Sequence, residues 1–142
     1  MTQEEKRDLL LQDLCARLPY GVIVYHPHYD EPETLDTVFS PDAWDEGGIW
    51  CTIDDSWDSP HKIKYCKPYL RPMSSMTEKE KKEYQSLCEI HSDHDADDNV
   101  TYYYFDTIES FDWLNKNMFD YRGLIDKELA IEVTEDNNPY KD

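Results

Sequence analysis

The sequence predicts an α+β fold, in which an antiparallel sheet of four to six strands carries two or three helices packed on one face. Three observations favour this class. Two segments combine a helix-capping box with an apolar stripe at helical spacing, short β-branched or aromatic segments follow one another closely, and 13% of the 142 residues are aromatic. We therefore expect one acidic domain over residues 1–133, followed by a flexible C-terminal tail over residues 134–142.

The two clearest helices begin at a threonine that is followed three residues later by a glutamate. Thr2 and Glu5 open the first, whose apolar residues recur at three- and four-residue steps until Pro19 stops it. Thr77 and Glu80 open the second in the same way, because the hydroxyl and the carboxylate satisfy amide groups that a helix start leaves free. The sequence therefore predicts both helix starts.

A third helix is expected after Asp106 or Thr107, either of which can cap it, and residues 121–129 are typical of a short helical turn. Between the helices, six segments have the composition of strands. They cover residues 20–25, 35–39, 49–53, 62–66, 100–105 and 129–133. The first four are separated by loops rich in Pro, Asp and Gly, which indicates an antiparallel meander.

Acidic residues are arranged in blocks. Residues 19–60 hold ten Asp or Glu and residues 83–112 hold nine, and neither block contains Lys or Arg. Between them, residues 61–82 hold seven Lys or Arg against two Glu, within a formal net charge of −18. Such acidity disfavours direct contact with nucleic-acid backbones or anionic membranes and favours basic protein partners.

The remaining composition indicates a cytoplasmic protein. The N-terminus lacks the basic start and apolar run of a secretory signal, and no apolar stretch approaches the ~20 residues that span a bilayer. The four cysteines contain no C-x-x-C pair, and three of them lie within apolar patterns, which is typical of structural thiols.

Two stretches carry a resemblance to a known group of proteins. They are Lys67-Pro-Tyr-Leu-Arg-Pro-Met-Ser-Ser-Met-Thr-Glu-Lys-Glu80 and Phe111-Asp-Trp-Leu-Asn-Lys-Asn-Met-Phe-Asp-Tyr-Arg-Gly-Leu-Ile-Asp-Lys127, followed by Leu-Ala-Ile-Glu-Val. With the opening helix and Leu18-Pro-Tyr-Gly-Val, they resemble small proteins of phages and mobile elements of gut anaerobes, a group without an assigned reaction or cofactor. The resemblance implies an accessory protein of a mobile element.

The same stretches also have a structural interpretation. Pro68 and Pro72 are expected to form a rigid exit from the fourth strand, and Gly123 to allow a turn with positive φ. The large aromatic residues of the second stretch are expected to fill the core. These are Trp113, Phe119 and Tyr121.

The Asp/His segment, residues 91–99, is the strongest candidate for chemistry. Asp93, Asp95 and Asp97 stand at alternate positions, as the first ligands of an EF-hand loop do, and their oxygens suit a divalent cation. The match ends there, because Asp98 replaces the required Gly and Tyr104 the final Glu. The alternatives are a solvated acidic loop between the second helix and the fifth strand, or a divalent-metal-dependent hydrolase or nuclease-like enzyme.

A second cluster contains His26, His28 and Asp30, which could hold zinc if another histidine came near. The available histidines are His61, His91 and His94. Pro27 prevents a helix from bringing the first two together. An exposed strand end is the alternative, and no resident cofactor is expected.

The acidic loops between the predicted strands are the candidate partner-binding surface. Acidic residues beside tryptophans suit a protein interface, because aromatic anchors ringed by charge are typical of such surfaces. The candidates are Asp42, Asp45, Glu46, Asp54, Asp55, Asp58, Trp44 and Trp57. About 18 phosphates of duplex DNA span ~31 Å, and so this charge is of the right order to mimic DNA.

The favoured function is therefore a non-catalytic acidic protein that engages a basic partner, of the kind that binds nucleic acid. The hydrolase described above is the alternative from another class. A structural or dimerising protein, whose acidic residues only provide solvation, is a third hypothesis. The sequence leaves the oligomeric state and the strand order open.

Overall fold

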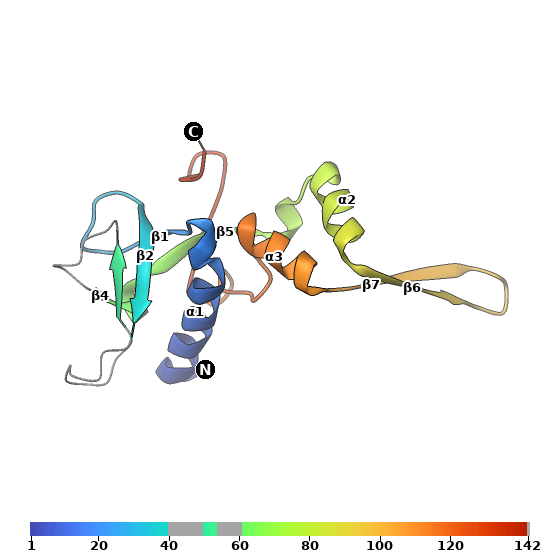
Figure 1. Ribbon diagram of the computed structural model, residues 1–142, viewed down its shortest axis with the longest axis horizontal. Coiled ribbons are helices and arrows are strands. Elements are labelled where there is room, and N and C mark those ends of the chain that lie inside the picture. The colour runs from blue at the N-terminus through green and yellow to red at the C-terminus, as the bar shows by residue number, and fades with distance from the viewer. Residues whose placement is uncertain (40–49, 54–60, 142) are drawn as a thin grey trace.

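A computed structural model describes residues 1–39, 50–53 and 61–141. It confirms the predicted α+β class, with three helices, a mostly antiparallel mixed sheet and a separate two-stranded hairpin in the described part of the chain (Figure 1). The helices are α1 (Gln3–Arg17), α2 (Glu78–Leu87) and α3 (Ile108–Lys116). None of these helices is long and apolar enough to cross a membrane.

The helix starts follow the predicted chemistry. Thr2 and Glu5 form a capping box on α1, and Thr77 and Glu80 form one on α2. Of the two candidates for the third helix, Thr107 is the residue that caps α3. Each cap satisfies backbone N–H groups that have no partner within the first turn of a helix.

Seven strands form the sheet of the described residues. They are β1 (Ile23–Tyr25), β2 (Glu33–Phe39), β3 (Trp50–Ile53), β4 (His61–Lys62), β5 (Lys67–Pro72), β8 (Phe119–Asp120) and β9 (Ile131–Glu132). Their order is β4-β3-β2-β1-β5-β8, and β9 also pairs with β5. The pairs from β4 to β5 are antiparallel, whereas β8 and β9 lie parallel to β5, so the sheet is larger and more mixed than predicted.

The prediction for the segment around Cys66 was wrong. The predicted strand over residues 62–66 is mostly a 3-10 turn, Ile63–Tyr65, and the predicted exit over Lys67–Pro72 is the strand β5. Prolines lack an N–H group, but the other backbone groups of this strand still bond to its parallel neighbours. The N–H of Arg71 donates to the carbonyl of Met118 at 2.7 Å, and the carbonyl of Leu70 accepts from Val133 at 2.8 Å.

The Asp/His segment also departs from the prediction of a loop. The chain leaves α2 at Leu87 and continues as β6 (Glu89–His94), which pairs with β7 (Val100–Phe105) through six residue pairs. The aromatic strand predicted at residues 100–105 therefore exists, but it pairs within a hairpin outside the main sheet. The polar strand β6 is extended because it pairs with the aromatic strand β7. Both strands are exposed to solvent, and so neither needs the alternation of apolar and polar residues that is typical of a strand with one buried face.

Residues 121–129 form turns and no helix, which corrects the predicted helical turn. The carboxylate of Asp120 accepts hydrogen bonds from the backbone N–H groups of Leu124 and Ile125, both at 2.9 Å. Gly123 has φ of 76°, as predicted for this turn. Side-chain capping of this kind offers the backbone an alternative to a helix.

The three aromatic residues that were predicted to fill the core differ in their burial. Phe119 is fully buried, whereas Trp113 and Tyr121 are half-buried. Trp113 stacks on Phe119 with the ring centroids 5.5 Å apart. The prediction that all three fill the core therefore holds for Phe119 alone.

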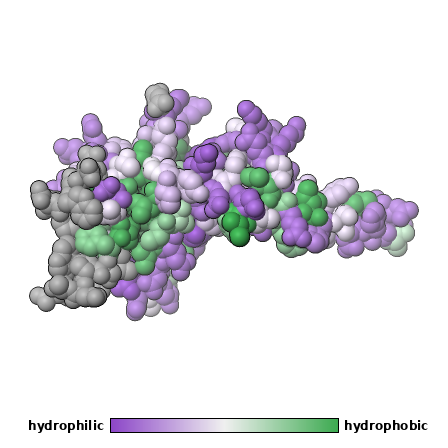
Figure 2. Space-filling model, in the orientation of Figure 1, coloured by the Kyte–Doolittle hydropathy of each residue, from purple (hydrophilic) through white to green (hydrophobic). Residues whose placement is uncertain are grey.

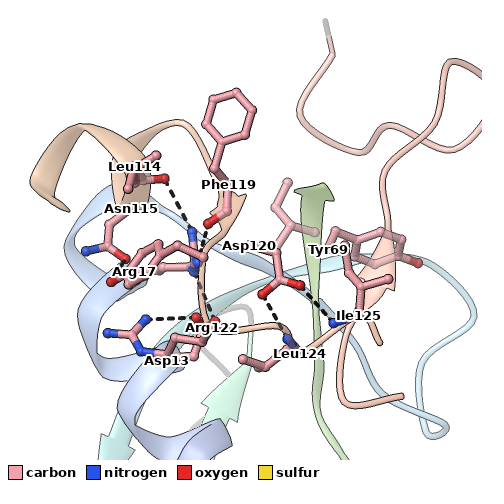
Figure 3. A network of polar contacts seen from close by, with 12 residues as sticks. Asp13, Arg17, Tyr69, Leu114, Asn115, Phe119, Asp120, Arg122, Leu124 and Ile125 are labelled. Carbon is pink, nitrogen blue, oxygen red and sulfur yellow. Dashed lines mark hydrogen bonds and ion pairs between the residues drawn. The ribbon is translucent and has the colours of Figure 1, made fainter. Parts of the chain in front are cut away.

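A buried ion-pair network joins α1 to the segment that follows α3 (Figure 3). Arg17 and Asp13 are fully buried, and the Nε of Arg17 donates to Oδ2 of Asp13 at 3.0 Å. The same guanidinium donates to the carbonyl oxygens of Leu114 at 3.4 Å and Phe119 at 2.6 Å. Arg122 donates to the other oxygen of Asp13 at 2.9 Å, so both carboxylate oxygens are paired.

The segment predicted as a flexible tail is held to the sheet at one point. The hydroxyl of Tyr140 donates to the carbonyl of Tyr69 at 2.9 Å and accepts from the N–H of Ile23 at 2.9 Å. Burial raises the pKa of Tyr140. These bonds tie the end of the chain to β1 and β5.

Replacing Arg17 tests the network. We expect Arg17→Met to lower the free energy of unfolding by about 3–5 kcal/mol, because it removes one of the two cationic partners of a buried carboxylate and leaves two carbonyls without this donor. Urea unfolding followed by circular dichroism measures the loss. The matched control is Arg7→Met, whose exposed pairs with Glu4 and Asp8 should contribute no more than about 1 kcal/mol. Equal losses in the two variants would contradict the importance of the network.

The Arg71–Glu80 pair predicts an acid-dependent loss of stability. Arg71 donates to both carboxylate oxygens of Glu80 at 2.7 and 2.8 Å, which lowers the pKa of Glu80 to about 2. A lowered pKa in the folded state stabilises the fold above the ordinary pKa of 4.5, and this contribution is lost as the pH falls towards 2.

We therefore expect Glu80→Gln to cost about 1.5 kcal/mol at neutral pH, and this difference from wild type to vanish as the pH falls from 4.5 to 2. Urea unfolding at a series of pH values measures it. Glu83→Gln, on the same helix, should show no such trend; a pH-independent cost of Glu80→Gln would show that the ion pair is not its cause.

Candidate functional site

The hairpin of residues 89–105, here called the arm, projects away from the sheet and α1 (Figure 1). Every residue of β6 and β7 is exposed to solvent. In Figure 2, hydrophobic and hydrophilic residues alternate along the arm, with hydrophobic residues also at its base. An exposed hairpin with large apolar side chains is typical of a contact surface.

The base of the arm is held by α2 and α3. The hydroxyl of Thr107 donates to the carbonyl of Leu87 at 2.7 Å, which joins the end of α2 to the start of α3. Asp106 accepts hydrogen bonds from the hydroxyls of Tyr84 and Ser110. Burial, and then the bond to Asp106, raise the pKa of Tyr84, so this phenol stays a hydrogen-bond donor. The arm therefore leaves the protein from a fixed base.

The strand register divides the arm into two faces, since residues directly opposite each other place their side chains on one side of a ribbon. The acidic face consists of Glu89, His91, Asp93, Thr101, Tyr103 and Phe105. The apolar face consists of Ile90, Ser92, His94, Val100, Tyr102 and Tyr104. Contacts confirm the assignment, because His91 pairs with Glu89 at 2.8 Å and its ring lies edge-on to Phe105.

The tip of the arm is a turn built by Asp95. Its Oδ1 accepts from the N–H groups of Asp97 at 2.8 Å and Asn99 at 2.9 Å, and its Oδ2 accepts from the side chain of Asn99 at 3.1 Å. These bonds lower the pKa of Asp95. Asp98 takes up positive φ, a conformation that Asp tolerates better than most residues. The carboxylate of Asp95 thus closes the hairpin.

This turn bears on the predicted metal ligands Asp93, Asp95 and Asp97. Asp93 lies in β6 and the other two lie in the turn, where the oxygens of Asp95 are already engaged by N–H groups. Across residues 1–39, 50–53 and 61–141, no three His, Cys, Asp or Glu side chains are arranged to hold a metal ion. The structure therefore gives no support to this ligand set, nor to a hydrolase built on it.

The predicted histidine cluster does form. Ring centroids lie 4.3 Å apart for His26 and His61 and 5.2 Å apart for His28 and His61, whereas His91 and His94 lie on the arm. The Nδ1 of His26 accepts from the backbone N–H of His28 at 3.0 Å, so the proton of the neutral ring is on the buried Nε2, which has no acceptor among the described residues. A protonated nitrogen has no lone pair for a metal, and the arrangement is therefore not a ligand set.

The electrostatics of this cluster agree with a neutral ring. Burial, followed by the nearby His61 and His28, lowers the pKa of His26. Burial and His28 lower the pKa of His61, whose Nε2 lies 3.1 Å from the hydroxyl of Tyr29. The rings of His26 and His61, both with a lowered pKa, therefore pack beside the end of β1.

The geometry does not favour a nucleophilic role for Cys51 or Cys66. The Sγ atoms of Cys51 and Cys66 lie 3.3 Å apart, and both side chains are fully buried. The hydrogen bond between the two thiols and their burial raise the pKa of Cys66, which disfavours a nucleophilic thiolate.

The predicted partner-binding residues lie outside the described residues. They are Asp42, Asp45, Glu46, Asp54, Asp55, Asp58, Trp44 and Trp57. They stay a prediction. Sequence reasoning missed the arm, although one signal was present: the turn-forming run Asp95–Asn99 separates two segments of equal length.

Comparison with known proteins adds no further constraint. No protein-family model, curated protein or solved structure matches this chain. The resemblance to proteins of phages and mobile elements therefore stays a prediction.

Proposed function

We propose that the chain is a non-catalytic acidic binding protein of a phage or mobile element. It acts in the cytoplasm by engaging a basic protein partner, of the kind that binds nucleic acid. The observation that carries this proposal is the acidic arm. Its base is held by α2 and α3, and every residue of its strands is exposed, so the arm presents its side chains to a partner from a defined position.

The charge of the arm selects a basic partner. Residues 89–105 contain five acidic side chains and no Lys or Arg. The acids are Glu89, Asp93, Asp95, Asp97 and Asp98. Two of them lie on the acidic face and three in the turn at the tip, a distribution that attracts cations and repels phosphates.

Aromatic side chains on the same face can provide contact area. Tyr103 and Phe105 are 48% and 53% exposed, and they lie beside Glu89 and Asp93 on the acidic face. Guanidinium groups stack on aromatic rings and pair with carboxylates, so this combination suits an arginine-rich surface. Such a surface is common in proteins that bind nucleic acid.

The predicted acidic loops with Trp44 and Trp57 form the second part of the proposal. They combine the same two elements, carboxylates and large aromatic rings. Both regions therefore suit the same kind of partner, a basic protein that binds the phosphates of a nucleic acid.

The test is affinity capture from a lysate of a natural host, at low and at moderate salt, followed by direct binding measurements with the purified captured protein. We expect one basic protein that is retained at both salt concentrations and is released by added duplex DNA. Glu89→Gln combined with Asp93→Asn should weaken its binding about twofold to thirtyfold, because an exposed ion pair contributes ~0.2–1 kcal/mol.

The matched control is Glu4→Gln combined with Asp8→Asn, which removes the same charge from α1. It should leave the affinity nearly unchanged. Equal weakening by the two double variants would show that the effect comes from net charge and not from the arm. Capture of many different basic proteins, all released at moderate salt, would contradict a specific partner.

A further inference from the structure

Two thiols, those of Cys51 and Cys66, are in contact in the core. Their Sγ atoms lie 3.3 Å apart, and both side chains are fully buried. Neither of the other cysteines shares this contact, because Cys15 is exposed and the Sγ of Cys88 donates to the carbonyl of Tyr84 at 3.4 Å. Bonded sulfur atoms lie about 2.0 Å apart, so the paired side chains need to approach by only about 1.3 Å.

The topology of the sheet explains why these two residues meet. Cys51 lies in β3, whereas Cys66 follows the turn Ile63–Tyr65 and precedes β5. In the sheet, β4 and β5 are separated by β3, β2 and β1, a distance of about 19 Å if the sheet were flat. The chain from Lys62 to Lys67 reaches no more than about 18 Å even when fully extended. The sheet therefore curls, and Cys66 reaches Cys51 within one apolar cluster.

We infer that Cys51 and Cys66 are a redox-responsive pair that forms an intrachain disulfide, with oxidised glutathione as the oxidant. When the S–S bond forms, the two thiols lose two protons and two electrons, and one molecule of oxidised glutathione takes them up to give two molecules of glutathione. Excess glutathione reverses the exchange, so the cross-link is reversible. The pair lies in β3 and in the connection from β4 to β5, apart from the arm, and the inference is independent of the proposed basic partner.

Burial determines when the exchange takes place. The hydrogen bond from the neighbouring thiol, and then burial, raise the pKa of Cys66, whereas attack on a disulfide requires a thiolate. The exchange is therefore slow in the folded chain and proceeds during folding or when this part of the core opens. A bond that has formed is protected from reduction by the same core.

The cross-link would stabilise the fold through the unfolded chain. The two cysteines are 15 residues apart in the sequence. Closing a loop of that length lowers the equilibrium constant for unfolding roughly a hundredfold, because the cross-linked unfolded chain has less conformational entropy. By linkage, folding favours formation of the bond by the same factor. The pair therefore couples the redox state of its surroundings to the stability of the sheet.

A metal site is the other common use of paired thiols. Structural zinc takes four protein ligands, and no third His, Cys, Asp or Glu joins this pair to hold a metal within residues 1–39, 50–53 and 61–141. A disulfide needs only two sulfur atoms. The geometry of the pair therefore fits a cross-link and not a zinc site.

The experiment refolds the full chain from concentrated urea in buffers with fixed ratios of reduced to oxidised glutathione. Free thiols are then alkylated, and a non-reducing digest maps the bonds by mass spectrometry. We expect one disulfide, which joins the peptides of Cys51 and Cys66 and makes them two hydrogen atoms lighter than the reduced peptides together. Cys15 and Cys88 should stay free. In chains held in urea, the equilibrium constant for this bond should be roughly a hundredfold smaller.

The stability of the two redox forms is the second measurement. The oxidised chain should unfold at a higher urea concentration than the same chain after reduction. Cys51→Ala removes one of the two sulfur atoms and should abolish this redox dependence. The matched control is Cys88→Ala, which removes a buried thiol outside the pair and should retain it.

Three results would each overturn the inference. They are a refolded chain without an intrachain bond in oxidised glutathione, mixed pairings that include Cys15 or Cys88, and an oxidised chain that is no more stable than the reduced one. If Cys51→Ala does not fold, the bond map and the two unfolding curves of the wild-type chain decide the question. These measurements contain no basic partner, so their failure would leave the proposed function to its own test.

Discussion

The buried Asp13–Arg17–Arg122 network is the constraint on which the arrangement of the helices depends. Removing these charges from water is costly, and the cost is offset only because both oxygens of Asp13 and two backbone carbonyls are paired at once. The carbonyl of Leu114 belongs to the last turn of α3, and that of Phe119 lies in β8. One guanidinium on α1 therefore determines where α3 ends and where the parallel strand beside β5 begins.

The position of the arm follows from this constraint through two helices. α3 is held at its end by Arg17 and at its start by the Thr107 cap, which also bonds to the last residue of α2. The other end of α2 is tied to β5 through Arg71 and Glu80. The strand β6 follows the end of α2, and β7 precedes the start of α3. The core therefore fixes the direction of the arm, while the exposed strands stay available for contacts.

Some elements of the fold could be predicted from interactions between residues that are close in the sequence, and others could not. The Thr2 and Thr77 capping boxes could be predicted because all of their partners lie within three residues. The role of Arg17 could not, since its partners at Leu114 and Phe119 are about a hundred residues away. The arm was interpreted as a loop and a sheet strand because an exposed strand such as β6 lacks the apolar alternation by which strands are recognised, and its pairing with β7 depends on a turn made by Asp95. The tryptophan-containing acidic loops could be proposed from composition alone, and they lie outside the described residues.

The arm also separates the acidic groups of this segment from an uncharged surface. The two-residue period of β6 places Glu89 and Asp93 on one side, and β7 contributes no charged residue, so a single ribbon has an acidic face and an uncharged face. Salt therefore acts mainly on the acidic face, because it screens the attraction of its carboxylates to cations. Both faces share the same backbone, and so packing on either one orders the ribbon that the other uses. Any packing against the uncharged face would thus lower the entropic cost of binding a basic partner on the acidic face.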